Sequence, residues 1–159
     1  MITLIPLADS PRCRLKEALG RLPRERFCLG SAAGREGTIL AISDLLEGEP
    51  VLPTGVVPGI PAVFSGQNQA AARFIGKLGL VPLDCGLSLR DTLTLSSLTE
   101  GSAMVSLQRP IVGLDGRMVE PVDLPLTLTR SWEPFHLLCC AGVLLLAGGT
   151  PALDAAKIF

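Results

Sequence analysis

The residues of this chain that could do chemistry begin with a glycine-rich turn, Gly30-Ser-Ala-Ala-Gly34-Arg-Glu-Gly37. Such a turn binds phosphate when a strand precedes it and a helix follows, because free backbone N–H groups then point at the anion. A triphosphate loop also needs a lysine after its last glycine, followed by Ser or Thr for Mg²⁺. Here Arg35 follows Gly34, and Glu36 stands where Ser or Thr would be. The turn predicts a site for a single phosphate or carboxylate on Gly30, Gly34 and Arg35, with a purely structural turn as the alternative.

Two further loops carry polar side chains just after the expected strands 62–64 and 80–83. In an open α/β sheet, the carboxyl ends of the strands line the ligand crevice. We therefore expect any ligand site to be built from these loops, and the alternative is surface turns without a ligand. The candidate side chains are Ser65, Gln67, Asn68, Asp84, Arg90 and Asp91.

The single histidine, His136, follows Glu133 by three residues and precedes Cys139 by three. A Cys-His pair on one helix face could supply a nucleophile, and the alternative is a histidine that packs or caps locally at a helix start. The five cysteines lack the paired spacing of zinc ligands, so the sequence predicts no metal site. Small, buried, reduced thiols are typical of cytoplasmic proteins.

The elements that must position these residues follow from apolar spacing and turn signals. The first half predicts strands at 2–7, 27–29, 62–64 and 80–83, and helices from Pro11 to Gly20 or Pro23, at 38–47 and at 68–78. A Gly/Pro-rich loop occupies 48–61. Strand, helix and strand in quick succession between 62 and 83 form a βαβ unit, which predicts a parallel sheet.

The pattern changes after Gly86. Alternating apolar residues at 92–95, 103–107 and 124–128, joined by Glu100-Gly101 and Asp115-Gly116, predict antiparallel hairpins. A final helix, 134–147, is apolar on nearly every side and should be buried. The sequence thus predicts a single α/β domain over 1–159, a mostly parallel three-layer sheet with a small antiparallel extension. Its parts are N-terminal βα units at 1–50, the loop at 51–61 and a second half at 62–159.

That second half resembles the central ATPase domain of the Mur ligases, the ATP-dependent amide ligases of peptidoglycan synthesis. The resemblance rests on Pro61-Ala-Val-Phe-Ser-Gly-Gln-Asn68, on Leu80-Val-Pro-Leu-Asp-Cys-Gly86, on the following hairpins, and on His136-Leu-Leu-Cys-Cys-Ala-Gly-Val. The resemblance implies an ATP site, but the residues that would build it differ. Ser65, Gln67 and Asn68 replace the Asn and Asp residues near adenine and ribose, and Leu137 and Cys140 replace the asparagines of the family's His-Asn motif.

Charge and composition exclude several function classes. Fourteen basic and fifteen acidic residues leave a net charge of −1, which is not the footprint of a nucleic-acid binder. The longest apolar run, 137–147, is shorter than the ~20 residues of a membrane span. The six basic residues between Arg12 and Arg26 form either a patch for an anionic partner or a solvated helix face.

Together these features predict a non-catalytic, cytoplasmic, Mur-ligase-like module, a pseudoenzyme without a cofactor. It would bind a small ligand or a protein partner and would form a homodimer through an unguarded sheet edge. The alternative is a subunit of a nucleotide-dependent amide ligase that a partner chain completes.

Overall fold

The computed structural model describes residues 1–159 and groups them into two compact units, Met1–Leu83 and Asp84–Phe159. Each unit is described by itself. The boundary falls inside one strand, β5 (Val81–Gly86). The α/β class with a mostly parallel sheet and a small antiparallel part is confirmed, whereas the single-domain organisation stays a prediction.

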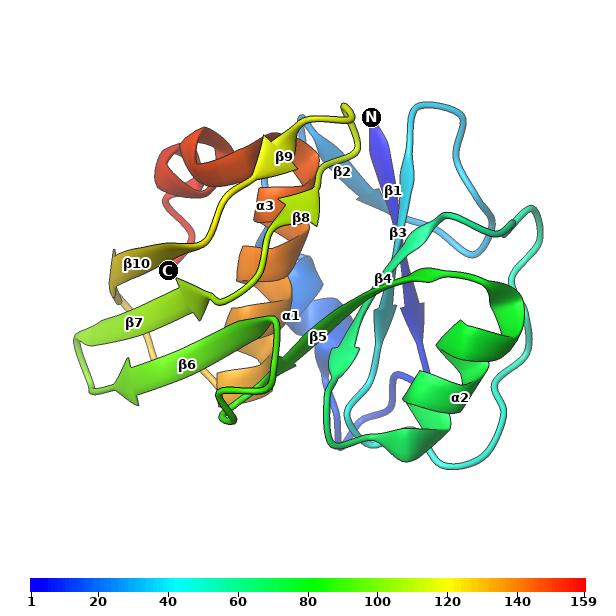
Figure 1. Ribbon diagram of the computed structural model, residues 1–159, viewed down its shortest axis with the longest axis horizontal. Helices are drawn as coiled ribbons and strands as arrows, with labels where there is room; N and C mark the ends of the chain where they lie inside the picture. The colour runs from blue at the N-terminus through cyan, green and yellow to red at the C-terminus, as the bar shows by residue number, and fades with distance from the viewer. The chain divides into compact units, whose positions relative to one another are not determined.

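The first unit is a parallel sheet with a helix on each face (Figure 1). Its strands follow the order β2-β1-β3-β4, with the first residues of β5 next to β4. The elements are β1 (Ile2–Leu7), α1 (Leu15–Leu19), β2 (Phe27–Leu29), β3 (Thr38–Ile42), β4 (Pro61–Ser65) and α2 (Gln69–Leu78). β1 pairs in parallel with β3 from Thr3↔Thr38 to Leu7↔Ile42 and with β2 from Ile2↔Phe27 to Leu4↔Leu29.

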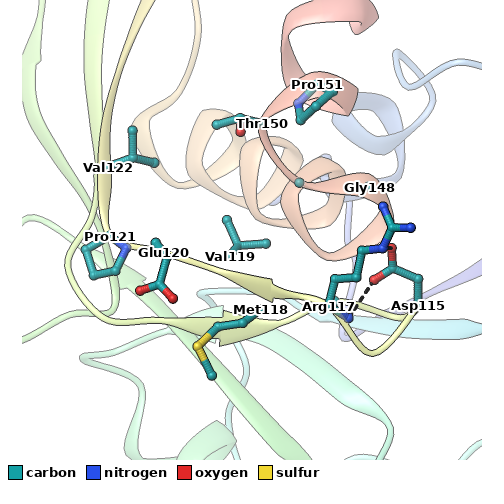
Figure 2. Close-up of a pocket in the computed structure, with 12 residues that line it drawn as sticks. Asp115, Arg117, Met118, Val119, Glu120, Pro121, Val122, Gly148, Thr150 and Pro151 are labelled. Carbon is teal, nitrogen blue, oxygen red and sulfur yellow. Dashed lines mark hydrogen bonds and ion pairs between the residues drawn. The ribbon is translucent and has the colours of Figure 1, made fainter.

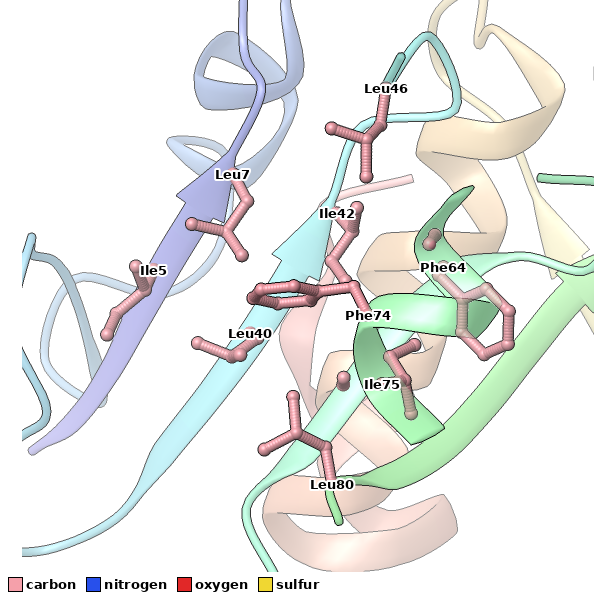
Figure 3. Close-up of a cluster of buried hydrophobic side chains, with 11 residues drawn as sticks. Ile5, Leu7, Leu40, Ile42, Leu46, Phe64, Phe74, Ile75 and Leu80 are labelled. Atoms are coloured by element: carbon pink, nitrogen blue, oxygen red, sulfur yellow. The ribbon is translucent and has the colours of Figure 1, made fainter. Parts of the chain in front are cut away.

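The core of this unit lies between the sheet and α2. Phe74 and Ile75 of α2 pack toward Leu40 and Ile42 of β3 (Figure 3). Every residue of β3 is buried, as expected for a parallel strand that is covered on both faces. The helix itself has the predicted bounds because both ends are capped. Asn68 accepts a hydrogen bond from the Ala71 N–H, and Gly79 ends the helix with φ of 65°.

One predicted helix of this unit is absent, and another begins later in the chain than predicted. Residues 38–42 form the central strand β3, because Ile39-Leu-Ala-Ile42 is a short apolar run that also fits a fully buried strand. The remainder of the predicted helix, up to Glu47, is loop. The first helix begins at Leu15 instead of Pro11, since Arg14 has a left-handed conformation (φ 58°) that interrupts a helix. It ends at Gly20, as predicted.

In the second unit, three antiparallel pairings follow one parallel pairing. β5 pairs in parallel with β6 (Leu93–Leu98), which pairs antiparallel with β7 (Ser102–Leu107). β7 pairs antiparallel with β10 (Val122–Thr127), and β8 (Ile111–Val112) and β9 (Met118–Val119) form a separate hairpin. The hairpins at Glu100-Gly101 and Asp115-Gly116 are therefore confirmed.

The last helix, α3 (Pro134–Ala156), is buried along its first part and broken near its end. Gly148 and Gly149 have non-helical backbone angles. The angles of Gly149 (φ 67°, ψ −161°) are a combination that only glycine adopts readily. α3 is the one helix whose length and composition would allow it to cross a membrane, but 67% of its most apolar window is buried inside the protein. It is therefore a core helix, as predicted.

Candidate functional site

The candidate site lies in the first unit, where the loops after β1, β3 and β4 meet. The strand order reverses around β1, because the chain leads from β1 to β2 on one side and from β3 to β4 on the other. A crevice outside the carboxyl ends of the strands at such a switch point is the usual ligand site of open α/β sheets. A cavity of about 400 Å³ lies there. Its lining residues are Ser10, Arg12, Asp44, Leu45, Leu46 and Glu47.

The loop after β1 gains its shape from Asp9. One oxygen of its carboxylate accepts hydrogen bonds from the N–H groups of Leu15 (2.6 Å) and Lys16 (3.3 Å), so it caps α1 from a distance. Ser10 closes the same loop, because its backbone oxygen accepts from the N–H groups of Cys13 and Arg14. The helix that Asp9 caps begins four residues later than the predicted helix start at Pro11.

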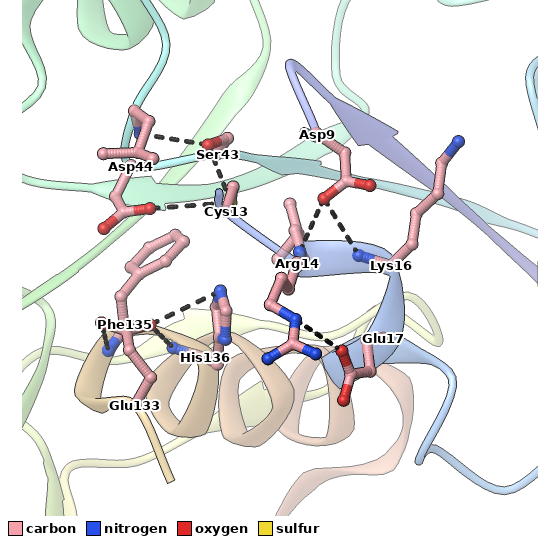
Figure 4. Close-up of polar contacts among 12 residues, drawn as sticks. Asp9, Cys13, Arg14, Lys16, Glu17, Ser43, Asp44, Glu133, Phe135 and His136 are labelled. Atoms are coloured by element: carbon pink, nitrogen blue, oxygen red, sulfur yellow. Dashed lines mark hydrogen bonds and ion pairs between the residues drawn. The ribbon is translucent and has the colours of Figure 1, made fainter. Parts of the chain in front are cut away.

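The loop after β3 is held by Ser43, whose side chain is fully buried. Its hydroxyl donates to the Cys13 sulfur over 3.0 Å and accepts from the Leu45 N–H (Figure 4). The Cys13 thiol also lies 3.8 Å from a carboxylate oxygen of Asp44. Burial raises the pKa of the Cys13 thiol, the hydrogen bond from Ser43 opposes this, and the Asp44 carboxylate raises the pKa further. The thiol therefore stays protonated at neutral pH and is a poor nucleophile.

The loop after β4 joins the same cluster through one side chain, Asn68. Its amide group donates to the backbone oxygens of Asp44 and Leu46, both at 3.1 Å, while its oxygen caps α2. Of the three predicted residues in this loop, Asn68 thus holds the loop after β3 in place beside the crevice. Gln67 is exposed and Ser65 is half-buried. Sequence reasoning missed Ser43 and Asp44, because it placed them inside a helix. Their position just after an apolar run was the available signal.

The glycine-rich turn lacks the strand-turn-helix setting that the sequence predicted for it. It connects two strands, β2 and β3, so no helix start follows it. The N–H groups of Gly30, Ala33 and Gly34 already donate to the Leu4 oxygen, the Thr54 oxygen and the Thr38 hydroxyl. A Cβ on Gly34 would lie 2.1 Å from the Thr3 hydroxyl, so close packing explains this glycine. The prediction of a strand-turn-helix phosphate site on Gly30, Gly34 and Arg35 is wrong in its setting, and Arg35 is exposed.

The remaining predicted residues form a separate cluster in the second unit. Asp84 accepts from both the N–H (3.2 Å) and the hydroxyl (2.6 Å) of Thr92. Arg109 donates to the same hydroxyl over 3.3 Å and to the backbone oxygen of Arg90. Asp91 is buried and accepts from the Ser88 N–H. These bonds hold the loop 87–92 in shape. The Asp84 and Asp91 carboxylates therefore serve mainly to stabilise this loop.

The second unit also contains a cavity of about 470 Å³ between the β8–β9 hairpin and the break in α3 (Figure 2). The hairpin approaches the helix closely, since the Leu114 N–H donates to the Leu146 oxygen over 2.8 Å. Four polar side chains line it, those of Asp115, Arg117, Glu120 and Thr150. The Asp115 carboxylate accepts from the Arg117 N–H and pairs with its guanidinium, so these two residues interact within the hairpin turn.

His136 of the predicted Cys-His pair contacts Glu133 at the start of α3. Glu133 caps α3 by accepting from the N–H groups of Phe135 and His136, and its carboxylate lies 3.5 Å from the His136 ring nitrogen Nε2. Cys139 is fully buried.

Comparisons with protein-family models, with curated proteins and with solved structures found no match.

Proposed function

We propose that this chain is a non-catalytic binding module that holds a small polar ligand in the crevice outside the carboxyl ends of β1 and β3. The observation that carries the proposal is the reversal of strand order at β1, with a polar cavity at the point where it occurs. The lining supplies one guanidinium, Arg12, and two carboxylates, Asp44 and Glu47. A ligand that carries both an anionic group and a hydrogen-bond donor or cation fits this charge arrangement.

The absence of an activated nucleophile beside the crevice supports binding without catalysis. The Cys13 thiol is buried, and its raised pKa keeps it protonated. The buried Ser43 hydroxyl donates to that sulfur and has no histidine or carboxylate base as its partner. Nucleotide-dependent ligation, the alternative, has less support, because the N–H groups of the glycine-rich turn are engaged within the fold.

A Mur-ligase-like ancestry is part of the proposal and is supported by the order of elements. A strand, a helix and a strand (β4, α2, β5) precede the antiparallel-paired strands β6, β7 and β10 and a buried helix with His136 in its first turn. A cytoplasmic location is also part of the proposal. It is supported by the free cysteines, four of which are buried.

Self-association has weaker support at the edge strand where it was expected. Pro125 lies in the middle of β10, the last strand in the hydrogen-bonded order. The Leu128 N–H bonds to the Gly101 oxygen, and in an antiparallel ladder such bonds recur at every second residue. Residue 125 therefore faces the open edge, where a proline offers no donor to a second strand. A homodimer, if formed, would use another surface.

The test is thermal unfolding of the purified chain with a panel of free amino acids, dicarboxylates, sugar phosphates and Mg²⁺-nucleotides. A ligand at 100 times its dissociation constant stabilises a protein by ~2.7 kcal/mol. We expect one class to stabilise the chain, and the effect to disappear in Arg12→Gln and Asp44→Asn but to persist in Arg73→Gln, on the exposed surface of α2. Stabilisation that survives the first two changes would refute this site. Stabilisation by Mg²⁺-ATP with phosphate release would favour the ligase alternative.

A further inference from the structure

A second pocket in the first unit lies between α1 and the edge strand β2, and the proposed function does not use it. Its volume is about 360 Å³, within the ~300–1,000 Å³ typical of small-molecule sites. Most of the lining is apolar. Leu4, Leu19, Leu22 and Phe27 are nearly inaccessible to solvent, and Leu29 at the edge is 46% exposed. The only charged side chain in the lining is that of Arg24.

The pocket exists because the elements around it are short. α1 has five residues, since Asp9 caps it only at Leu15 and Gly20 ends it. β2 has three residues and lies at the edge of the sheet. A helix of this length covers little of the sheet, so the apolar side chains beyond its end are left beside a hollow.

The charge around the pocket is mainly positive. Residues 12–26 contain six basic and two acidic side chains, a net charge of +4 in a chain whose overall net charge is −1. Glu17 neutralises part of this charge by pairing with Arg14 (3.0 Å) and Arg21 (3.9 Å). Arg24 has no ion pair, and the Arg26 guanidinium lies 5.9 Å from the centre of the Phe27 ring. One guanidinium without an ion pair, that of Arg24, therefore lines the apolar hollow.

We propose that this pocket binds a small amphipathic anion, a medium-chain fatty carboxylate, with the chain against the leucines and the carboxylate on Arg24. A guanidinium binds a carboxylate through two parallel hydrogen bonds, which an uncharged head group cannot replace. The apolar lining supplies affinity in proportion to the buried chain length. The site is independent of the crevice at the other strand ends, so either proposal can fail alone.

The first experiment is calorimetric titration of the full chain with hexanoate, octanoate and octylammonium. We expect octanoate to bind more tightly than hexanoate, by about fourfold for each added methylene. Octylammonium has the same chain and the opposite charge, so it should bind at least about tenfold more weakly than octanoate. Equal binding of the two eight-carbon probes would overturn the proposal, because the guanidinium would then have no role.

Variants and a thiol probe test the location. Arg24→Glu should weaken octanoate binding by at least about tenfold. Arg73→Glu, at an exposed arginine of α2, is the matched control and should leave binding unchanged. Cys28 lines the pocket and is the one exposed cysteine, so octanoate should slow its alkylation by iodoacetamide. Unchanged alkylation in the presence of bound octanoate would refute this pocket as the binding site. Binding to phosphatidylglycerol vesicles without binding to free octanoate would also refute it and would indicate a lipid-surface contact.

Discussion

The side-chain amide of Asn68 donates to the backbone oxygen of Asp44 over 3.1 Å, and so joins the start of α2 to the loop after β3. The same amide donates to the Leu46 oxygen, and its own oxygen caps the helix. One residue thus satisfies three backbone groups, and it fixes one wall of the crevice to the helix that packs on the core. The shape of the candidate site and the stability of the first unit are therefore linked.

Asn68→Ala should lower the free energy of unfolding by about 2–3 kcal/mol, because it removes a helix cap and leaves two carbonyl groups without their donor. Asn68→Asp is the matched control. It keeps the capping oxygen for the Ala71 N–H but cannot donate to Asp44 or Leu46. Urea unfolding of the three proteins separates the two effects. Equal stability of Asn68→Ala and the parent would contradict the role assigned to Asn68.

Cys85 should make the protein less stable at alkaline pH. Burial, and then the Asp84 and Asp91 carboxylates, raise the pKa of its thiol well above the usual range. The unfolded thiol titrates near pH ~8.5, so the folded state binds more protons above that pH. The stabilisation is complete below about pH 8.5 and is lost as the pH rises, by up to ~1.4 kcal/mol per pH unit.

Urea unfolding between about pH 7 and pH 10 measures this slope. Cys85→Ala should reduce the slope, although the lost volume lowers stability at every pH. Cys28→Ala, which removes the exposed cysteine, is the matched control for the loss of a thiol. An unaltered slope in Cys85→Ala would assign the alkaline loss to other groups.

Gly34→Ala should destabilise the first unit by about 1–3 kcal/mol, since the new methyl group would lie 2.1 Å from the Thr3 hydroxyl. Combining it with Thr3→Ala removes the hydroxyl and should restore part of the loss. Gly101→Ala serves as the control, because a Cβ there meets nothing within 4 Å. Thermal unfolding of these three variants and the parent tests whether this glycine serves packing. A neutral Gly34→Ala would reopen the possibility that the turn serves a ligand.

Gly149→Ala should cost about 1–3 kcal/mol, because its backbone angles (φ 67°, ψ −161°) are accessible almost only to glycine. Gly76→Ala gives the opposite expectation in the same protein. Gly76 lies inside α2 with open space around it, so alanine should stabilise the helix by about 0.5–1 kcal/mol. If the break in α3 is a fixed feature of the fold, chemical denaturation should show that the two variants change the free energy of unfolding in opposite directions.

Elements whose ends are set by local interactions could be predicted from the sequence alone. The bounds of α2 follow from Asn68 and Gly79, and the β8–β9 hairpin follows from Asp115-Gly116, since a capping side chain or a left-handed glycine acts within a few residues. Alternation of apolar residues also predicted the antiparallel strands β6, β7 and β10. A period of two is hard to confuse with a helix when several strands repeat it.

The conformation of the run Ile39–Ile42 depends instead on long-range strand pairing. Its apolar residues fit one face of a helix as well as a strand, and pairing with β1 and β4 on both sides selects the strand. That choice places Ser43 and Asp44 at a strand end and creates the crevice. The contact between the β8–β9 hairpin and α3 is likewise tertiary, since the Leu114 N–H bonds to the Leu146 oxygen. Partners that lie far apart in sequence leave no local pattern, because the interaction exists only after the chain has folded.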